Sequence, residues 1–277
     1  MNLTDLTASE ISALDRDATV VVVPLGSIEQ HGPHLPVATK CFLSEAIAFA
    51  AAARLRSEQL ECLITPTFPF MPCQSSSGFA SNFAMAARTY SDALYEIGSS
   101  FCRDGFKFLY FVNLSVSPDA IKAVSVAVED LNTLKGFRAF DPIPLWNFSP
   151  NEELESFMRQ RGVDPANEIH ADIKETSAAM HLDPELVRGD LLAGLKPCRI
   201  NTAWEVLKGN FSFQEMGSTA GYLGSPALAD PELGRLYIAE AAFALAESVN
   251  YTLSGNDLPE LPLQIRMLLK MVDLDEM

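Results

Sequence analysis

A short segment near the N-terminus carries most of the side chains that could do chemistry. Glu29, His31 and His34 lie within six residues of one another, and glycines and prolines flank them. Such flanking residues lower the freedom of the unfolded loop and fix its backbone. A rigid loop that presents a carboxylate and an imidazole is suited to binding a metal ion or to acid–base catalysis. The alternative is that Glu29 and His31 only satisfy buried backbone groups.

Histidines and cysteines are few, which limits any further metal site. The 277 residues include four histidines and five cysteines. The histidines are His31, His34, His170 and His181. The cysteines are odd in number and form no Cys-x-x-Cys pair, which fits neither a zinc knuckle nor a disulfide framework. We therefore expect free thiols.

Composition and charge exclude several classes of protein. Hydrophobic residues make up 48% of the chain, which is enough for a sizeable core and excludes a disordered chain. The net charge of −16 argues against nucleic acid or an anionic membrane as a partner, because both need basic patches. The first residues do not resemble a signal segment, and no apolar run reaches the roughly 18 residues of a membrane span. These features predict a cytoplasmic protein.

The elements that must position the Glu29 loop alternate between strands and helices. Apolar runs predict strands over residues 18–24, 62–66, 106–112 and 137–145. Helical patterns cover residues 42–56, 90–103, 118–134, 152–161, 175–180, 231–253 and 261–272. This alternation predicts an α/β fold with a mostly parallel sheet, in one domain spanning residues 1–277. Loops 26–40 and 67–81 follow strands at the carboxyl edge, where such folds bind ligands.

Three segments resemble the creatininase (creatinine amidohydrolase) family. Residues 26–36 read G-S-I-E-Q-H-G-P-H-L-P, close to the signature of that family. Residues 170–177, H-A-D-I-K-E-T-S, and residues 221–226, G-Y-L-G-S-P, match later motifs in the same order. The resemblance implies a creatininase-like three-layer α/β/α fold and metal-dependent hydrolysis. It also implies a ring-like homo-oligomer, to which the helix at 261–272 could contribute a contact, although packing on its own domain is the more frequent use of such a helix.

The same resemblance suggests roles for individual side chains. It assigns metal-ligand roles to Glu29, His31 and Glu175. His170 corresponds to a family histidine and becomes a candidate proton donor or acceptor, or a residue that only packs beside Glu175. His34 is expected to be structural and to fix the turn that precedes it. His181 is expected on the surface, with no specific role.

Two departures from the family pattern affect the metal site. Lys40 stands where the family has the aspartate that bridges two ions, and Ser115 stands where a metal-binding histidine is expected. At about 4 Å and an effective dielectric near 20, one like-charge contact costs roughly 4 kcal/mol. We therefore expect either one divalent ion per chain, zinc or manganese, or none. Lys40 could act as a catalytic lysine, but a charge partner for Glu29 is its simpler role.

Two functions remain open at this point. The first is a divergent amidohydrolase-like enzyme that cleaves a cyclic amide or another non-peptide C–N bond of a small molecule, and is not creatininase itself. It would use one ion or Lys40, together with His170. The second is a metal-free, non-catalytic paralogue that binds a ligand or serves a structural role. That alternative predicts an ion pair between Lys40 and a carboxylate in the former metal pocket.

Overall fold

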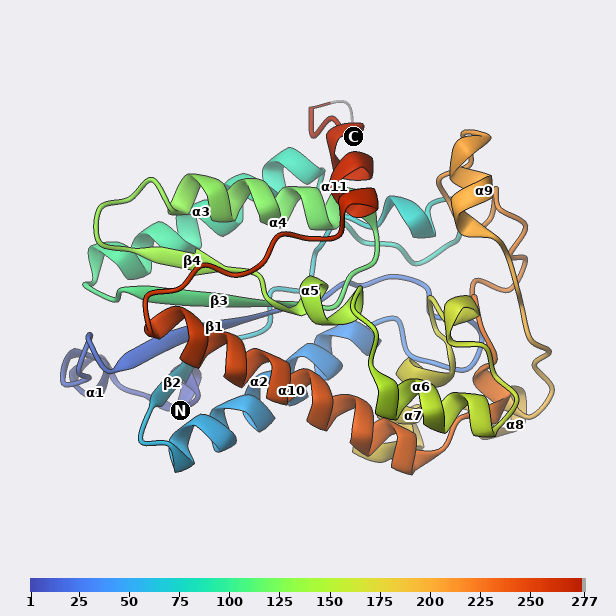
Figure 1. Cartoon of the computed structure of the whole chain (residues 1–277), viewed down its shortest axis with the longest axis horizontal. Coiled ribbons are helices and arrows are strands. Elements are labelled where there is room, and N and C mark those ends of the chain that lie inside the picture. The colour runs from blue at the N-terminus through green and yellow to red at the C-terminus, as the bar shows by residue number, and fades with distance from the viewer. Residues whose placement is uncertain (276–277) are drawn as a thin grey trace.

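A four-stranded parallel sheet forms the centre of the computed structural model, which describes residues 1–275 (Figure 1). The strand order is β2-β1-β3-β4, and every neighbouring pair is parallel. The strands are β1 (Thr19–Leu25), β2 (Glu61–Ile64), β3 (Phe108–Asn113) and β4 (Arg138–Phe140). The predicted parallel sheet is therefore confirmed.

Helices cover both faces of the sheet and complete the predicted three-layer α/β/α fold (Figure 1). One face carries α2 (Thr39–Ser57) and α10 (Pro231–Leu253). The other face carries α3 (Ala87–Arg103) and α4 (Pro118–Leu131). The shorter helices are α1 (Ala8–Ser12), α5 (Ile143–Asn147), α6 (Glu152–Gln160), α7 (Ile173–Leu182), α8 (Gly189–Leu192), α9 (Thr202–Leu207) and α11 (Leu263–Lys270).

Strand β1 lies between both helical layers, which explains its unbroken run of valines. Val20 and Val22 belong to the core that contains α2 and α10. Val21 and Val23 belong to the opposite core, which contains α3 and α4. Successive side chains of a strand point to opposite faces, so a strand covered on both sides needs an apolar residue at every position. The end of this strand therefore holds the following loop firmly.

The prediction of a strand over residues 137–145 is wrong for residues 141–145. The observed strand ends at Phe140, and the helix α5 begins at Ile143. Pro142 and Pro144 explain the difference, because a proline has no N–H for a strand ladder and is well tolerated at the start of a helix. The apolar run alone did not distinguish these two structures.

The predicted free thiols are confirmed, since all five cysteines are unpaired. Among residues 1–275, none of the helices is both long and apolar enough to cross a membrane.

Gly234 allows α10 to approach α7 closely, and we expect its replacement by alanine to be costly. A Cβ atom at this position would lie 2.0 Å from the backbone oxygen of Ser177, which cannot move without shifting α7. Gly234→Ala should lower the free energy of unfolding by about 2 kcal/mol or more. Gly189→Ala is the control, because open space surrounds Gly189, and it should change stability by less than about 1 kcal/mol. Urea unfolding measures both, and equal values for the two variants would contradict the close approach.

Candidate metal centre

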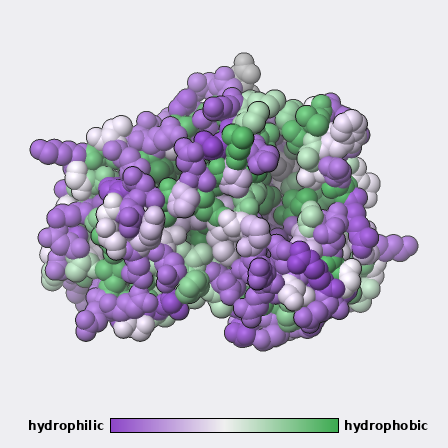
Figure 2. Space-filling view, viewed as in Figure 1, coloured by the Kyte–Doolittle hydropathy of each residue, from purple (hydrophilic) through white to green (hydrophobic). Residues whose placement is uncertain are grey.

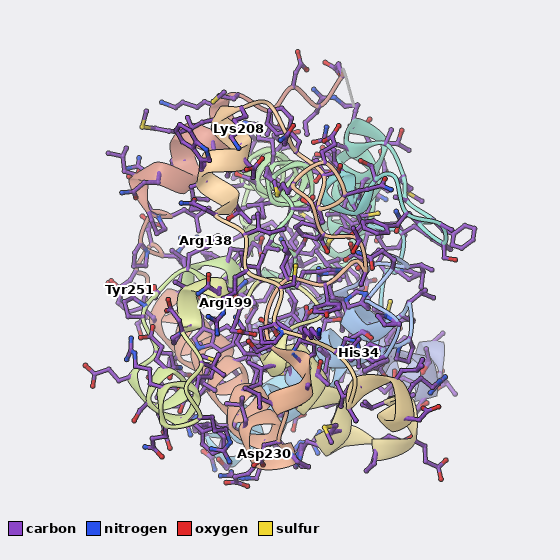
Figure 3. All side chains as sticks on the ribbon, turned by 90° about the vertical axis from the view of Figure 1, so that its right-hand side faces the viewer. His34, Arg138, Arg199, Lys208, Asp230 and Tyr251 are labelled. Atoms are coloured by element: carbon purple, nitrogen blue, oxygen red, sulfur yellow. The ribbon has the colours of Figure 1, made fainter. Side chains whose placement is uncertain are left out.

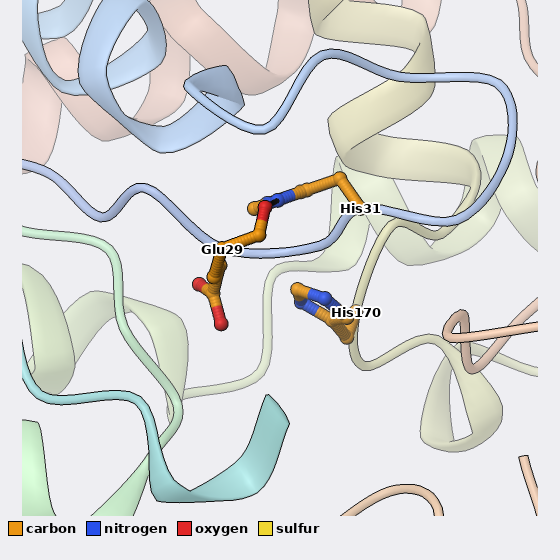
Figure 4. Close-up of side chains that lie close together, drawn as sticks. All are labelled: Glu29, His31 and His170. Atoms are coloured by element: carbon orange, nitrogen blue, oxygen red, sulfur yellow. Dashed lines mark hydrogen bonds between the residues drawn. The ribbon is translucent and has the colours of Figure 1, made fainter. Parts of the chain in front are cut away.

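Two distant parts of the chain bring the predicted site residues together. Glu29 and His31 lie on the loop that leaves β1, and His170 lies just before α7 (Figure 4). One ligand atom from each of these three side chains falls within 4.8 Å of the other two. The two imidazole rings lie with their centroids 4.5 Å apart, and both are fully buried. The carboxylate of Glu175, from the first turn of α7, completes the cluster.

Backbone carbonyls orient both imidazoles. His31 Nδ1 lies 3.1 Å from the carbonyl oxygen of Glu29, and His170 Nε2 lies 2.9 Å from that of Gln30. A carbonyl oxygen only accepts, so these contacts assign the ring proton to His31 Nδ1 and to His170 Nε2. The 2.9 Å contact of His170 is shorter than its 3.4 Å contact with the Gln30 side chain. The opposite ring nitrogens, His31 Nε2 and His170 Nδ1, are both buried without a hydrogen-bond partner.

The two unpartnered ring nitrogens converge on one carboxylate oxygen. Glu175 Oε2 lies 3.8 Å from His31 Nε2 and 3.9 Å from His170 Nδ1. Burial, with smaller contributions from His31 and Lys40, lowers the pKa of His170 to about 3, so this ring is neutral near pH 7. Ligand atoms of a tetrahedral zinc site lie about 3.4 Å apart, slightly closer than these. Two unpartnered imidazole nitrogens beside one carboxylate oxygen form a donor set that fits a divalent cation.

The backbone beside this oxygen is strained. Ala171 has a φ of 46°, a left-handed conformation that alanine rarely adopts. Its N–H donates a 2.6 Å hydrogen bond to Glu175 Oε2, which fixes the carboxylate between the two histidines. Strain of this kind persists where the surrounding structure enforces it, and it is frequent at functional sites.

Lys40 forms a buried ion pair with Glu29, as the non-catalytic alternative predicted. Lys40 Nζ donates a 2.8 Å hydrogen bond to Glu29 Oε1, and both side chains are almost completely buried. Ser27 donates to the same oxygen at 2.7 Å, and Ser76 donates to Glu29 Oε2 at 2.6 Å. Three donors therefore satisfy this carboxylate, which leaves Glu175 as the carboxylate in direct contact with the free imidazole nitrogens.

The pKa shifts of the pair describe its charge state. Burial alone would raise the pKa of Glu29, but the Lys40 ammonium holds that pKa well below its usual range. Burial alone would lower the pKa of Lys40, but Glu29 and Glu175 raise it above its usual value. Both groups are therefore charged near neutral pH, and a neutral Lys40 acting as a general base does not fit this environment.

The other histidines and Ser115 lie outside the cluster. His34 is buried and structural, as expected, but its Nε2 contacts Thr176 Oγ1 at 2.8 Å, so it joins the loop to α7 rather than only fixing its own turn. His181 is exposed near the end of α7, as predicted. The Ser115 hydroxyl accepts a hydrogen bond from the backbone N–H of Ser117. That contact closes the turn after β3.

Sequence reasoning missed three residues that shape this site. Ser27 belongs to the recognised motif, and its position two residues before Glu29 was an available signal. Ser76 is 47 residues from Glu29 in the chain, and nothing local indicates their contact. Ala171 lies inside the second motif, but the sequence does not reveal its left-handed backbone.

Comparison with known proteins decides the family. The family model for creatininase, described as creatinine amidohydrolase, matches residues 4–249. The chain belongs to the creatininase family. A relative in this family, the mycofactocin precursor peptide peptidase of Mycobacterium ulcerans (strain Agy99), is 28% identical over 86% of this chain and 87% of its own length. The protein of the same name from Mycobacterium tuberculosis (strain ATCC 25618 / H37Rv) is 33% identical over 35% of this chain and 40% of its own.

Solved structures of creatininases have the same fold. A putative creatinine amidohydrolase from Bacteroides fragilis superposes with a TM-score of 0.68 and 23% identity, over 94% of this chain and 98% of its own. A structure titled "Creatininase Mn" gives a TM-score of 0.70 at 19% identity, over 91% of this chain and 98% of its own. A mutant creatininase of Zn-Zn type matches with a TM-score of 0.70 at 18% identity, over the same shares of the two chains. Zinc and manganese, the two metals named for these creatininases, are also the two expected from the sequence of this chain.

Proposed function

We propose that this creatininase-family chain is an amide hydrolase that binds one divalent ion through His31, His170 and Glu175. The observation that carries the proposal is the pair of buried imidazole nitrogens, both without hydrogen-bond partners, on either side of Glu175 Oε2. This set differs from the one expected from sequence, because His170 joins the ligands and Glu29 pairs with Lys40. When bound, a zinc or manganese ion would supply an activated water and polarise the amide carbonyl.

The chain's own residues prepare this position. The carbonyls of Glu29 and Gln30 hold the ring protons of the histidines away from it, an arrangement typical of metal-ligating histidines. The Ala171 N–H fixes the Glu175 carboxylate. Lys40 neutralises Glu29, so the buried carboxylate does not add a second uncompensated charge. The Lys40 ammonium lies on the Glu29 side of the cluster and would repel a second cation there. We therefore propose one bound ion and not two.

We propose that the bond it hydrolyses is an amide bond within a peptide. The curated relative that spans most of the chain is named a precursor peptide peptidase, which supports a peptide over the cyclic amide or other non-peptide bond expected from sequence. The cavity beside Glu175 has a volume of about 1680 Å³. Sites for drug-sized molecules are typically about 300–1,000 Å³, so the cavity supports a larger substrate.

Metal titration tests this proposal. Zinc or manganese is added to chelator-treated protein, and binding is measured by calorimetry and by elemental analysis. The stoichiometry should approach one ion per chain. His170→Ala and Glu175→Gln should each weaken metal binding by more than about tenfold. Loss of a group that only hydrogen-bonds to a metal ligand already weakens binding by about tenfold or more, and loss of a ligand should cost at least as much. His181→Ala is the matched control, since His181 is exposed and outside the cluster. Unchanged affinity in both site variants would exclude this ligand set.

The Lys40–Glu29 ion pair supports a second candidate, a metal-free paralogue that binds a ligand without catalysis. In that protein the ammonium takes over the charge balance that an ion provides elsewhere in the family. The same titration separates the two candidates. Protein expressed with added zinc and manganese that retains neither ion, and cleaves no peptide, would favour the metal-free paralogue.

A further inference from the structure

The cavity beside the candidate metal centre leads outward between two short helices. Its inner end is lined by Glu175 and by Phe213, whose ring stacks on His170 with centroids 4.9 Å apart. Its outer part is lined by residues of α9 and α11, which lie about sixty residues apart in the chain. Figure 3 shows this side of the molecule, with Lys208 marking the end of α9. The cavity therefore connects Glu175, one of the proposed metal ligands, to these two helices.

Helix α9 presents an apolar stripe that no other part of the described chain covers. Trp204, Leu207 and Phe211 follow one another at helical spacing, although Phe211 lies just beyond the helix end. Their exposed fractions are 57%, 79% and 40%. Leu207 and Phe211 also line the cavity. Large apolar side chains with this exposure, gathered at the mouth of a cavity, are typical of a binding surface.

Helix α11 presents a matching stripe on the other side of the cavity. Leu263, Met267 and Met271 are spaced four residues apart and are 59%, 60% and 74% exposed. Leu269, on the opposite side of this helix, is buried, and α11 packs against α4. The helix thus packs on its own domain with one face, as the sequence favoured, and leaves the methionine face open. Figure 2 shows apolar surface around the hollow in this region.

We infer that these two stripes form a groove that binds an extended, apolar segment of the peptide substrate and leads its amide bond to Glu175. The inference rests on the proposed function. Its support is the continuity of the groove with the cavity that reaches Glu175. Methionine side chains are flexible and polarizable, which suits them to accept apolar side chains of varied shape.

The charges along the cavity restrict the substrate further. Six acidic side chains line it against three basic ones, Arg159, Lys174 and Lys270. Glu168 keeps one buried carboxylate oxygen without a hydrogen-bond partner, whereas the corresponding oxygen of Asp172 lies 3.4 Å from Lys174 Nζ. An acidic peptide would meet like charges here, and a basic one would meet opposite charges. The groove therefore favours a peptide that combines apolar side chains with basic ones.

Peptide binding tests the groove independently of catalysis. The probe is a fluorescein-labelled peptide of about eight residues with leucine or phenylalanine alternating with lysine, since alternate side chains of an extended peptide point to the same side. A second probe has serine in place of the apolar residues. Fluorescence anisotropy with chelator present should show at least about tenfold tighter binding of the apolar probe. The double variant Leu207→Ser and Met267→Ser should remove most of that preference.

The controls separate this inference from the proposed function. The double variant Leu191→Ser and Leu228→Ser changes two exposed leucines outside the cavity and should bind the apolar probe normally. His170→Ala should lose hydrolysis but keep peptide binding. Equal affinity for the two probes would overturn the groove even if hydrolysis persists. The groove would also be overturned if the Leu207→Ser and Met267→Ser changes altered the mass measured by light scattering and left peptide affinity unchanged, because a second copy would then occupy this face.

Discussion

Lys40→Met is expected to lower the free energy of unfolding by about 3–5 kcal/mol. The substitution keeps most of the side-chain volume but leaves the Glu29 carboxylate charged, buried and without its cation. Ser27 and Ser76 still donate hydrogen bonds to this carboxylate, but neither supplies a positive charge. Urea unfolding at neutral pH, followed by circular dichroism, measures the loss.

Two further variants show whether the loss comes from the buried charge. Glu29→Gln combined with Lys40→Met removes both charges and should recover most of the stability, since a matched neutral pair leaves no buried ion. Lys208→Met breaks an exposed ion pair with Glu205 and should cost less than about 1 kcal/mol. If Lys40→Met is no more harmful than Lys208→Met, the buried ion pair does not exist in solution.

The second large effect is acid destabilisation through His34. Burial, with a smaller contribution from His31, lowers the pKa of His34 from 6.5 to about 4. A base with a lowered folded-state pKa takes up its proton more readily in the unfolded chain. Its stabilising contribution is therefore complete above pH 6.5 and is lost as the pH falls toward 4. The shift corresponds to about 3 kcal/mol at full loss.

His34→Gln isolates this contribution, because glutamine can still contact Thr176 and does not titrate in this range. Unfolding free energies measured between pH 7 and pH 4 should fall less steeply in the variant than in the wild type. The Glu29 carboxylate acts in a different window, since its lowered pKa gives stability that is lost only as the pH falls below about 4.5. Parallel curves for the two proteins above pH 4.5 would contradict the His34 assignment.

The sequence by itself determined the sheet, the family and the identity of the central residues. The valines of β1 could only be accommodated between two layers of helices, and the alternation of elements required a parallel sheet. The motif from Gly26 to Pro36 carried enough specific positions to indicate the family, which the family match confirmed. The Lys40 substitution was visible in the sequence, and its pairing with a carboxylate follows from the cost of burying an isolated charge.

Only the tertiary structure decided which of these residues pair with one another and which remain free to bind a ligand. Whether Lys40 pairs with Glu29 or Glu175, and which imidazole nitrogens remain free, depends on carbonyls and hydroxyls that lie far apart in the chain. The groove between α9 and α11 depends likewise on two helices that the chain brings together only on folding. Local patterns record which faces are apolar, but they do not record what covers them. Proximity between distant segments arises from packing, so the proposed metal-ligand set and the proposed substrate groove could be inferred only from the folded chain.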